Sequence, residues 1–282
     1  MALTGPVLVT GAGGLLGGEV VRALQASGAE VAAYAHAVLD IGDRDAVGDV
    51  VRSMRPRAVV NAAALTQVDR CETDPDGCRA ANALGPGYLA EAAEEVGAEV
   101  VHVSTDYVFD GTKGSPYVET DTPSPLQTYG RCKLDGEHAV RDATARSYVL
   151  RTALVFGPGG RNFLSRLPEL LQTGQPVSLV TDQVGSPTYA PDLAAAIVGL
   201  LGSHSYGLYH VSNAGGCTMV EFCALIAEVL GVDPNITELT RDDLNRPARR
   251  PADTRLDGPA WRAAGFASLR GWREAATASA AP

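Results

Sequence analysis

A glycine-rich turn near the start of the chain joins a short apolar run to a helical pattern. The run 6–10 leads into Gly11, Gly14 and Gly17, a GxxGxxG spacing, and apolar residues then recur at helical spacing over 15–26. Glycines in such a turn let bare backbone approach a pyrophosphate, which then lies on the amides and the positive dipole of the following helix. The turn therefore predicts dinucleotide binding, with a purely structural glycine turn as the alternative.

Strand and helix patterns alternate along the first half of the chain. The apolar runs are rich in Val and Ala, which is typical of parallel strands that are covered on both faces. The sequence therefore predicts the α/β class, with a Rossmann-type doubly wound parallel sheet. The predicted strands are 30–34, 58–61, 99–104 and 147–152, and the predicted helices are 44–54, 84–96 and 126–145.

The alternation weakens after residue 152. We place the Rossmann domain at 1–160, with the chain returning to it at about 188–212, and expect a smaller C-terminal substrate-binding lobe from 161–187 and 213–282. The further elements predicted are a loop at 156–160, helices at 163–172, 191–201 and 218–230, a strand at 207–211, and an irregular arginine-rich segment at 241–255.

The charge balance limits the partners. The formal net charge is −10, which argues against binding nucleic acid or an anionic membrane by bulk attraction, so an anionic ligand needs a local site. Residues 1–21 lack the charged start of a secretory signal, and the apolar stretch 193–201 is too short to span a bilayer, so we expect a cytoplasmic protein. The five cysteines form no CxxC pair and the histidines no HExxH motif, which predicts reduced thiols and no metal site.

The end of the second strand bears on the choice of dinucleotide. In many NAD proteins an acidic residue there binds the adenosine 2′-hydroxyl, but this strand runs Tyr34-Ala35-His36, with neither an acid nor an arginine. Nothing charged excludes a 2′-phosphate, so we favour NADPH slightly over NADH; His36 is equally well interpreted as a surface residue. Asp40 is either an acceptor for the adenine amino group or a helix N-cap.

A tyrosine and a lysine four residues apart form the second chemical signal. Tyr129 and Lys133 lie on one face of the predicted helix, and an ammonium beside a phenol stabilises the phenolate and lowers its pKa. Thr105 follows the predicted strand 99–104, at the carboxyl edge where doubly wound sheets bind ligands. The three side chains would supply a hydroxyl, a proton donor and a tuning cation; the alternative is a capping threonine beside an ordinary surface helix.

Further motifs are Val60-Asn-Ala-Ala-Ala64, Ser104-Thr-Asp-Tyr-Val-Phe-Asp-Gly111, Asp182-Gln-x-Gly-Ser-Pro-Thr188 and Arg250-Pro251. Together with the glycine turn and Tyr129-x-x-x-Lys133, they resemble the dTDP-4-dehydrorhamnose reductase family of extended short-chain dehydrogenases/reductases. The resemblance extends over about residues 6–272, nearly the whole chain. It implies NAD(P)H-dependent reduction of the C4 ketone of a nucleotide-linked 4-keto-6-deoxyhexose.

The resemblance also implies particular residues. Tyr129 would protonate the developing alkoxide, Lys133 would hold the nicotinamide ribose, and Thr105 would bind the reacting oxygen. The alanines 62–64 would pass under the cofactor or, alternatively, form a packing layer of small residues. Expected cofactor-binding residues are Gly11, Gly14, Leu15, Leu16, Gly17, Asp40, Ile41, Ala62, Ala63, Ala64, Tyr129 and Lys133, and expected substrate-binding residues are Thr105, Asp106, Leu154, Asn162 and Arg250, the last as a partner for the diphosphate.

Some residues depart from the family pattern. Ala153-Leu154 stands where the family usually has Ser-Trp, Cys132 where serine is usual, and Asp253-Thr254 where Asn-Ser is usual, which leaves the sugar substrate open. A nucleotide-sugar dehydratase or epimerase is one alternative, although Tyr107 stands where a dehydratase has its catalytic glutamate. A non-catalytic regulatory subunit on the same fold is another, and a homodimer is one expectation for the assembly.

Overall fold

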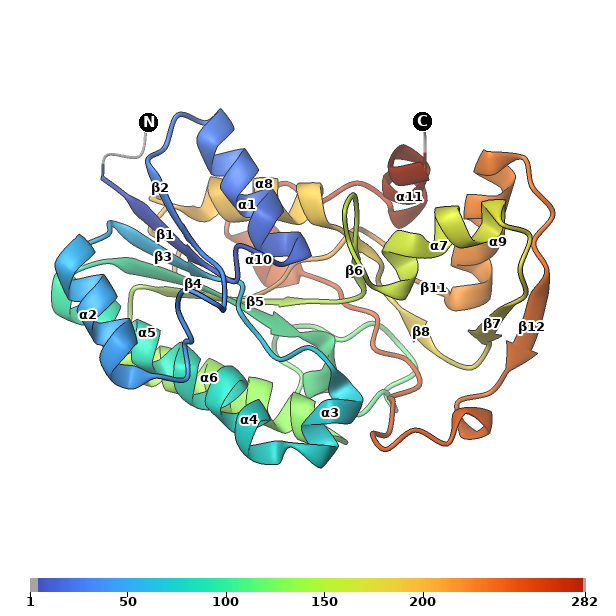
Figure 1. Ribbon diagram of the computed structural model, residues 1–282, viewed down its shortest axis with the longest axis horizontal. Coiled ribbons are helices and arrows are strands. Elements are labelled where there is room, and N and C mark those ends of the chain that lie inside the picture. Colours follow the sequence, from blue (N-terminus) through green and yellow to red (C-terminus); the bar gives the residue numbers. More distant parts are fainter. Residues whose placement is uncertain (1–4, 281–282) are drawn as a thin grey trace.

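The computed structural model describes residues 5–280, so residues 1–4 and 281–282, at the outer ends of the two predicted units, lie outside it. A six-stranded sheet of order β10-β5-β4-β3-β1-β2 forms the centre of the larger unit (Figure 1). All five pairings are parallel, which confirms the predicted Rossmann-type fold. The strands are β1 (Val7–Thr10), β2 (Val31–Tyr34), β3 (Ala58–Asn61), β4 (Glu99–Thr105), β5 (Ser147–Thr152) and β10 (Gly207–His210).

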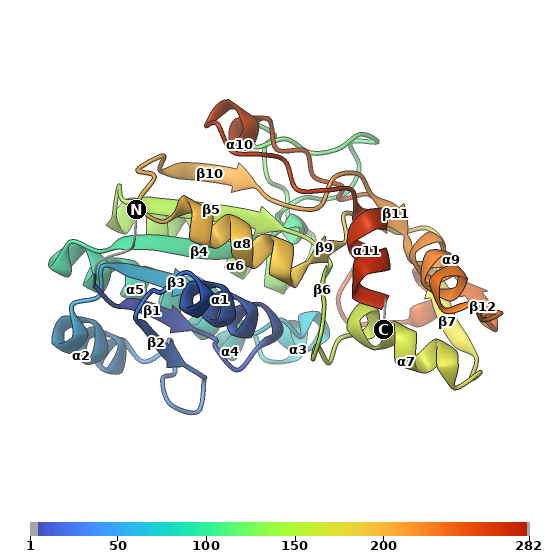
Figure 2. The ribbon, with the colours of Figure 1, turned by 90° about the horizontal axis from the view of Figure 1, so that it is seen from above.

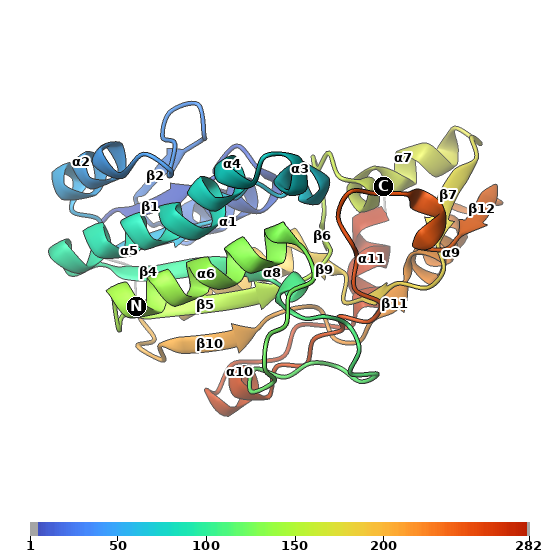
Figure 3. The same ribbon diagram turned by 90° about the horizontal axis from the view of Figure 1, so that it is seen from below.

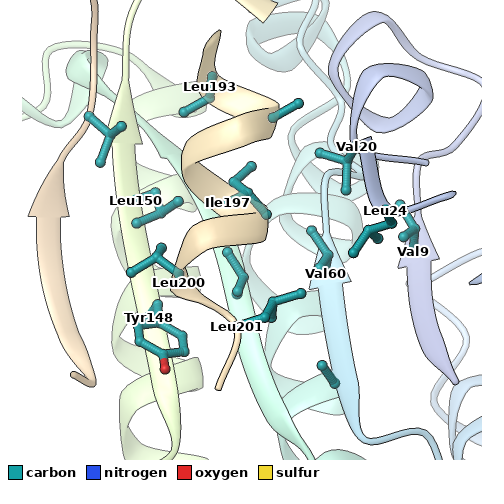
Figure 4. Close-up of a cluster of buried hydrophobic side chains, with 14 of the residues drawn as sticks. Val9, Val20, Leu24, Val60, Tyr148, Leu150, Leu193, Ile197, Leu200 and Leu201 are labelled. Atoms are coloured by element: carbon teal, nitrogen blue, oxygen red, sulfur yellow. The ribbon is translucent and has the colours of Figure 1, made fainter. Parts of the chain in front are cut away.

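Helices cover both faces of this sheet because its strands are apolar on both sides. Helices α1 (Leu15–Ala26) and α8 (Ala190–Leu200) pack on one face, as Figure 2 shows. Helices α2 (Arg44–Met54), α5 (Gly85–Val96) and α6 (Thr128–Ala143) cover the other face, seen in Figure 3. The first face encloses a core that includes Val9, Val20, Leu24, Val60, Leu150, Leu193 and Ile197 (Figure 4).

A second, smaller unit lies beyond the carboxyl ends of the sheet strands (Figures 1 and 2). Its core contains Leu167, Leu179, Phe222 and Trp272 and is separate from the cores of the sheet. Thr218 and Glu221 form a capping box that starts α9. The unit contains α7 (Phe163–Gln172), α9 (Met219–Leu230) and α11 (Trp272–Ala280), the parallel pair β7 (Val177–Val180) and β12 (Ile236–Leu239), and the antiparallel pair β8 (Val184–Gly185) and β11 (Cys217–Thr218).

Two short helices between β3 and α5 were not predicted. Helix α3 (Val68–Thr73) and helix α4 (Pro75–Arg79) are each too short to show a helical period, and a π-helical turn, Ala80–Leu84, continues α4 into α5. The short parallel pair of β6 (Val155–Phe156) and β9 (Thr188–Tyr189) was also not predicted. The segment 241–255 contains only one short helical turn, Asp242–Leu244, as its irregular composition predicted.

The packing of the C-terminal segment differs from the predicted division. Helix α10 (Pro259–Ala263) places Trp261 on the sheet core, where its ring contacts Tyr209 edge-on and stacks on Phe266. Residues 259–266 therefore pack on the Rossmann core, within a range that was expected to belong to the lobe. No periodic pattern shows which of two cores a single tryptophan enters, so the sequence did not reveal this.

Two further expectations concern the state of the cysteines and the presence of a membrane-spanning helix. All five cysteines are free and buried, in agreement with the predicted reduced thiols. Within residues 5–280, no helix has the combined length and apolar character that crossing a membrane requires.

Candidate active site

A cavity of about 1110 Å³ opens at the carboxyl edge of the sheet. It extends from the glycine turn after β1, past the ends of β3 and β4, to the start of α7. The cavity brings together all but one of the predicted site residues. Those that line it are Gly11, Gly14, Leu15, Leu16, Gly17, Asp40, Ile41, Ala62, Ala63, Ala64, Thr105, Asp106, Tyr129, Lys133, Leu154 and Asn162.

The glycine turn is built for close backbone contacts. Gly11 has φ +70°, and a Cβ atom there would lie 2.6 Å from the backbone of Ala62. A Cβ atom at Gly17 would lie 2.2 Å from the Gly11 carbonyl oxygen, so only glycine lets α1 begin this close to the turn. Gly14 is the N-cap of α1, and no side chain of the described residues caps that helix end. Free amides at a helix N-terminus fit a pyrophosphate.

The loop after β3 forms the next part of the cavity wall. The Ala63 amide donates to Asn61 Oδ1 at 3.1 Å, and the methyl side chains of the alanines keep the wall flat. Asn82, in the π-helical turn, accepts from the Leu65 amide and donates to the Leu65 carbonyl, both at 3.0 Å. Asn82 thus holds this loop in place, and nothing in the sequence had indicated it.

The loop after β2 lines the cavity where an adenosine would bind. His36 and Asp40 are both exposed, with 83% and 60% of their side chains accessible. Asp40 accepts from the Gly42 amide at 2.9 Å, whereas Asp43 is the N-cap of α2, so the N-cap alternative for Asp40 is wrong. No acidic residue ends β2, and the nearest carboxylate to His36 among the described ion pairs is Asp40, whose Oδ1 lies 3.9 Å from His36 Nδ1.

Thr105, Tyr129 and Lys133 converge on this cavity from two elements. Thr105 is the last residue of β4, and its hydroxyl lies 3.1 Å from Asp106 Oδ1 and accepts from the Tyr107 amide. Tyr129 and Lys133 lie one turn apart near the start of α6. The carboxyl end of β4 lies beside the start of α6 in space. The Thr105 hydroxyl, the Tyr129 phenol and the Lys133 amine therefore line the same cavity.

The electrostatics of the tyrosine and the lysine differ from the sequence-based expectation. Burial raises the pKa of Tyr129, although a hydrogen bond with Thr105 opposes the rise. The Lys133 ammonium is directed elsewhere, since Nζ donates to the Val103 carbonyl at 2.6 Å. Burial lowers the pKa of Lys133 to about 8. Burial is therefore the larger effect on both groups, and the pKa of Tyr129 lies above its ordinary value rather than below it.

Asp106 is a second buried acid at the same edge. It is 4% exposed and accepts from the Thr254 hydroxyl at 2.5 Å, besides its contact with Thr105. Burial raises the pKa of Asp106 to about 6, and the two hydroxyl contacts oppose that rise. The contact with Thr254 also ties the end of β4 to the C-terminal segment.

Arg250 is the predicted site residue that the structure places differently. Its guanidinium forms a two-pronged ion pair with the Asp69 carboxylate, and it is not among the described residues that line the cavity. The pair holds the C-terminal segment against α3. The charge that was expected to bind a diphosphate is therefore already partnered within the protein.

Two residues of the predicted substrate wall have structural constraints. Leu154 has φ +45°, an unusual backbone conformation for a leucine, and its side chain fills the space beside Gly185. Asn162 caps α7, because Oδ1 accepts from the Ser165 amide while Nδ2 donates to the Val155 carbonyl. Both polar groups of Asn162 are thus engaged within the protein.

Thr152 and Tyr107 are two polar residues among the cavity residues that sequence reasoning missed. Thr152 ends β5, and its buried hydroxyl has no partner among the described residues. The rule that identified Thr105, a hydroxyl at the carboxyl end of a parallel strand, could have identified it as well. The Tyr107 hydroxyl accepts from Gln183 Nε2 at 3.2 Å and its ring meets Tyr129 edge-on, contacts that connect residues far apart in the sequence.

Comparisons with known proteins agree with this geometry. Residues 5–282 match the RmlD substrate binding domain family. The chain belongs to this family. It is 42% identical to the spore coat polysaccharide biosynthesis protein SpsK of Bacillus subtilis (95% of this chain, 94% of that protein) and 41% identical to a dTDP-4-dehydrorhamnose reductase of Streptomyces griseus (96% and 92%). A dTDP-4-dehydrorhamnose reductase from Bacillus anthracis, crystallised with NADP, superposes with a TM-score of 0.94 at 32% identity (98% and 99%).

Gly17→Ala is expected to weaken dinucleotide binding in this family member by roughly tenfold or more, because the added methyl group collides with the Gly11 carbonyl and displaces the start of α1. The measurement is a fluorescence titration with NADPH and with NADH. Gly18→Ala is the matched control, since its Cβ atom would have its nearest neighbour at 3.6 Å. Equal affinities in the two variants would contradict the predicted close approach.

Asp106→Asn is expected to stabilise the protein at neutral pH. Between the ordinary pKa of 3.8 and the folded-state value of about 6, the folded wild type binds a proton that the unfolded chain has released, so wild-type stability falls as pH rises. The asparagine does not ionise, so the variant does not lose stability in this way as the pH rises. Its free energy of unfolding should exceed that of the wild type by up to about 3 kcal/mol above pH 6.

Urea unfolding at several pH values measures this difference, which should vanish below about pH 4. Asp110→Asn is the control with the opposite sign, because hydrogen bonds from Tyr117 and Thr112 lower the pKa of Asp110. A variant at Asp106 that is less stable than the wild type at neutral pH would show that its charged hydrogen bonds outweigh the cost of burial.

Proposed function

We propose that this protein is an NAD(P)H-dependent reductase that reduces the C4 ketone of a dTDP-linked 4-keto-6-deoxyhexose. The observation that carries the proposal is the cavity shared by the glycine turn, Thr105 and Tyr129. The names of its relatives and the NADP-bound structure of one of them support the same reaction. Either dinucleotide fits the end of β2, with a slight preference for NADPH.

The residues divide the chemistry between them. The amides at the start of α1 would hold the pyrophosphate, and the alanines 62–64 would lie along the dinucleotide. A bound reduced nicotinamide supplies the hydride. Tyr129 donates its proton to the carbonyl oxygen as the alkoxide develops, and Thr105 donates a hydrogen bond to the same oxygen. The raised pKa of Tyr129 keeps the phenol protonated at neutral pH, so its proton is present when the carbonyl is reduced.

The decisive experiment follows NADPH absorbance with a dTDP-4-keto-6-deoxy sugar as substrate. Oxidation that depends on the sugar supports the proposal. No oxidation, together with tight binding of a protein partner, would favour the regulatory-subunit alternative. The cytoplasmic location, the homodimer and the lack of nucleic-acid partners stay predictions.

Tyr129→Phe is expected to lower kcat by about a hundredfold or more, because the variant cannot give a proton to the carbonyl oxygen. Dinucleotide affinity should be close to that of the wild type, since the ring is retained. Stopped-flow and steady-state assays measure turnover, and a fluorescence titration measures binding. Turnover like that of the wild type would contradict the role of Tyr129.

Leu154→Trp is expected to change the ranking of 4-keto sugars in favour of the rhamnose precursor. Leucine gives the cavity an apolar wall without the flat surface on which a sugar ring packs. The ranking is measured as kcat/KM over a panel of dTDP-4-keto sugars. An unchanged ranking would show that Leu154 does not contact the sugar.

A further inference from the structure

A chain of buried polar side chains runs under the sheet edge to Lys133. The Thr10 hydroxyl donates to Asn61 Oδ1 at 2.8 Å, and Asn61 Nδ2 lies 3.1 Å from His102 Nδ1. His102 Nε2 in turn lies 3.4 Å from Lys133 Nζ. All four residues are 1% exposed or less. The chain thus connects β1, β3 and β4 with the amine on α6.

The hydrogen bonds of Asn61 determine which nitrogen of His102 carries the proton. The Ala63 amide can only donate, and it donates to Asn61 Oδ1, so the other side of the amide must be the NH₂ group. That NH₂ group faces His102 Nδ1, which must therefore be an acceptor without a proton. A neutral imidazole then carries its proton on Nε2, and a proton on both nitrogens is excluded by the same contact.

The Nε2 proton of His102 points to the Lys133 nitrogen. A neutral amine can accept this hydrogen bond while it donates to the Val103 carbonyl at 2.6 Å. An ammonium has no lone pair with which to accept a hydrogen bond from His102 Nε2. Its positive charge is also repelled by the partial positive charge on the Nε2 hydrogen. The contact therefore favours the neutral form of the lysine.

We propose that His102 is a positioning residue whose Nε2 proton, held in place by Asn61, makes Lys133 readily lose and regain a proton. With the function proposed above, on which this meaning rests, Lys133 lines the same cavity as Tyr129, so it can give a proton to the Tyr129 phenolate left after each turnover and take one back from water in that cavity. General acid–base groups work best when they exchange protons near the working pH. Burial lowers the pKa of Lys133 as well, in the same direction as the contact with His102.

The other groups around Lys133 do not produce this effect. Glu137, on the same helix, raises the pKa of Lys133, as does Cys78 on α4, so both act in the opposite direction to His102. The Glu137 carboxylate is itself neutralised by Arg151, whose Nη2 lies 2.7 Å away. Burial favours the neutral amine in a nonspecific way, and His102 does so through a single directed contact.

The chain contains only two lysines, which gives a direct measurement. In protein labelled with ¹³C-lysine, the Cε resonances of Lys113 and Lys133 are followed against pH without substrate or dinucleotide. His102→Leu removes the N–H group, and the midpoint of Lys133 should rise by about one pH unit. His210→Leu is the matched control, because it removes another buried histidine and should leave that midpoint unchanged. Lys113 serves as the internal reference.

An unchanged Lys133 midpoint in folded His102→Leu would overturn the proposal. Measurement of imidazole ¹⁵N shifts in the wild-type protein tests it without any substitution at residue 102. His102 should be the Nε2–H tautomer, whereas His210 should carry its proton on Nδ1, which faces the carbonyls of Tyr117 and Asp257. A proton on Nδ1 of His102 would also overturn the proposal.

The catalytic part has a separate readout. The alkaline limb of the pH profile of kcat should move to higher pH in His102→Leu, in step with the midpoint of Lys133. If the Lys133 midpoint moves but the alkaline limb of the kcat profile does not, the contact between His102 and Lys133 has no role in catalysis. Absence of any reductase turnover in the wild type would instead count against the proposed function, since the lysine titration does not depend on it.

Discussion

A buried ion pair between Glu137 and Arg151 holds helix α6 on the sheet, and the candidate active site depends on it. The Glu137 carboxylate accepts from Arg151 Nε and Nη2 and from the Ser104 hydroxyl, so it joins α6 to both β5 and β4. Both charged side chains are less than 5% exposed. Removing one partner of such a pair leaves an unpaired buried charge and costs about 3–5 kcal/mol. Because Lys133 precedes Glu137 by one helical turn, the pair also places the amine over the end of β4.

Parallel strand pairing explains why the remaining site residues meet. Strands β1, β3, β4 and β5 all end at the same edge, so the glycine turn, the alanines 62–64, Thr105 and Thr152 line one cavity. The second unit lies beyond that edge. The Arg250–Asp69 and Asp106–Thr254 contacts connect the C-terminal segment to the edge of the sheet. The cavity can thus hold a dinucleotide along the sheet edge and a second ligand toward the smaller unit.

Sequence patterns predicted those parts of the fold that arise from neighbouring residues. The six strands of the large sheet and the long helices were predicted, whereas β7, β12 and the two-residue strands were not, and α3 and α4 were missed because helices of five or six residues span barely more than one turn. The placement of Trp261 on the sheet core was missed because its partners, Tyr209 and Phe266, give no periodic signal. In the site, spacing placed Tyr129 and Lys133 on one helix face, but no spacing connects Asn82 with Leu65.

The sequence by itself determined the glycine turn, the order of strands and helices, and the pairing of a phenol with an amine on one helix, because each depends on residues within a few positions of one another. The tertiary structure alone decided how those groups are charged and partnered. Lys133 contacts Val103 and His102, burial raises the pKa of Tyr129, and Arg250 is engaged by Asp69. Protonation and ion pairing depend on burial and on groups from distant segments, and these are set only when the chain has folded.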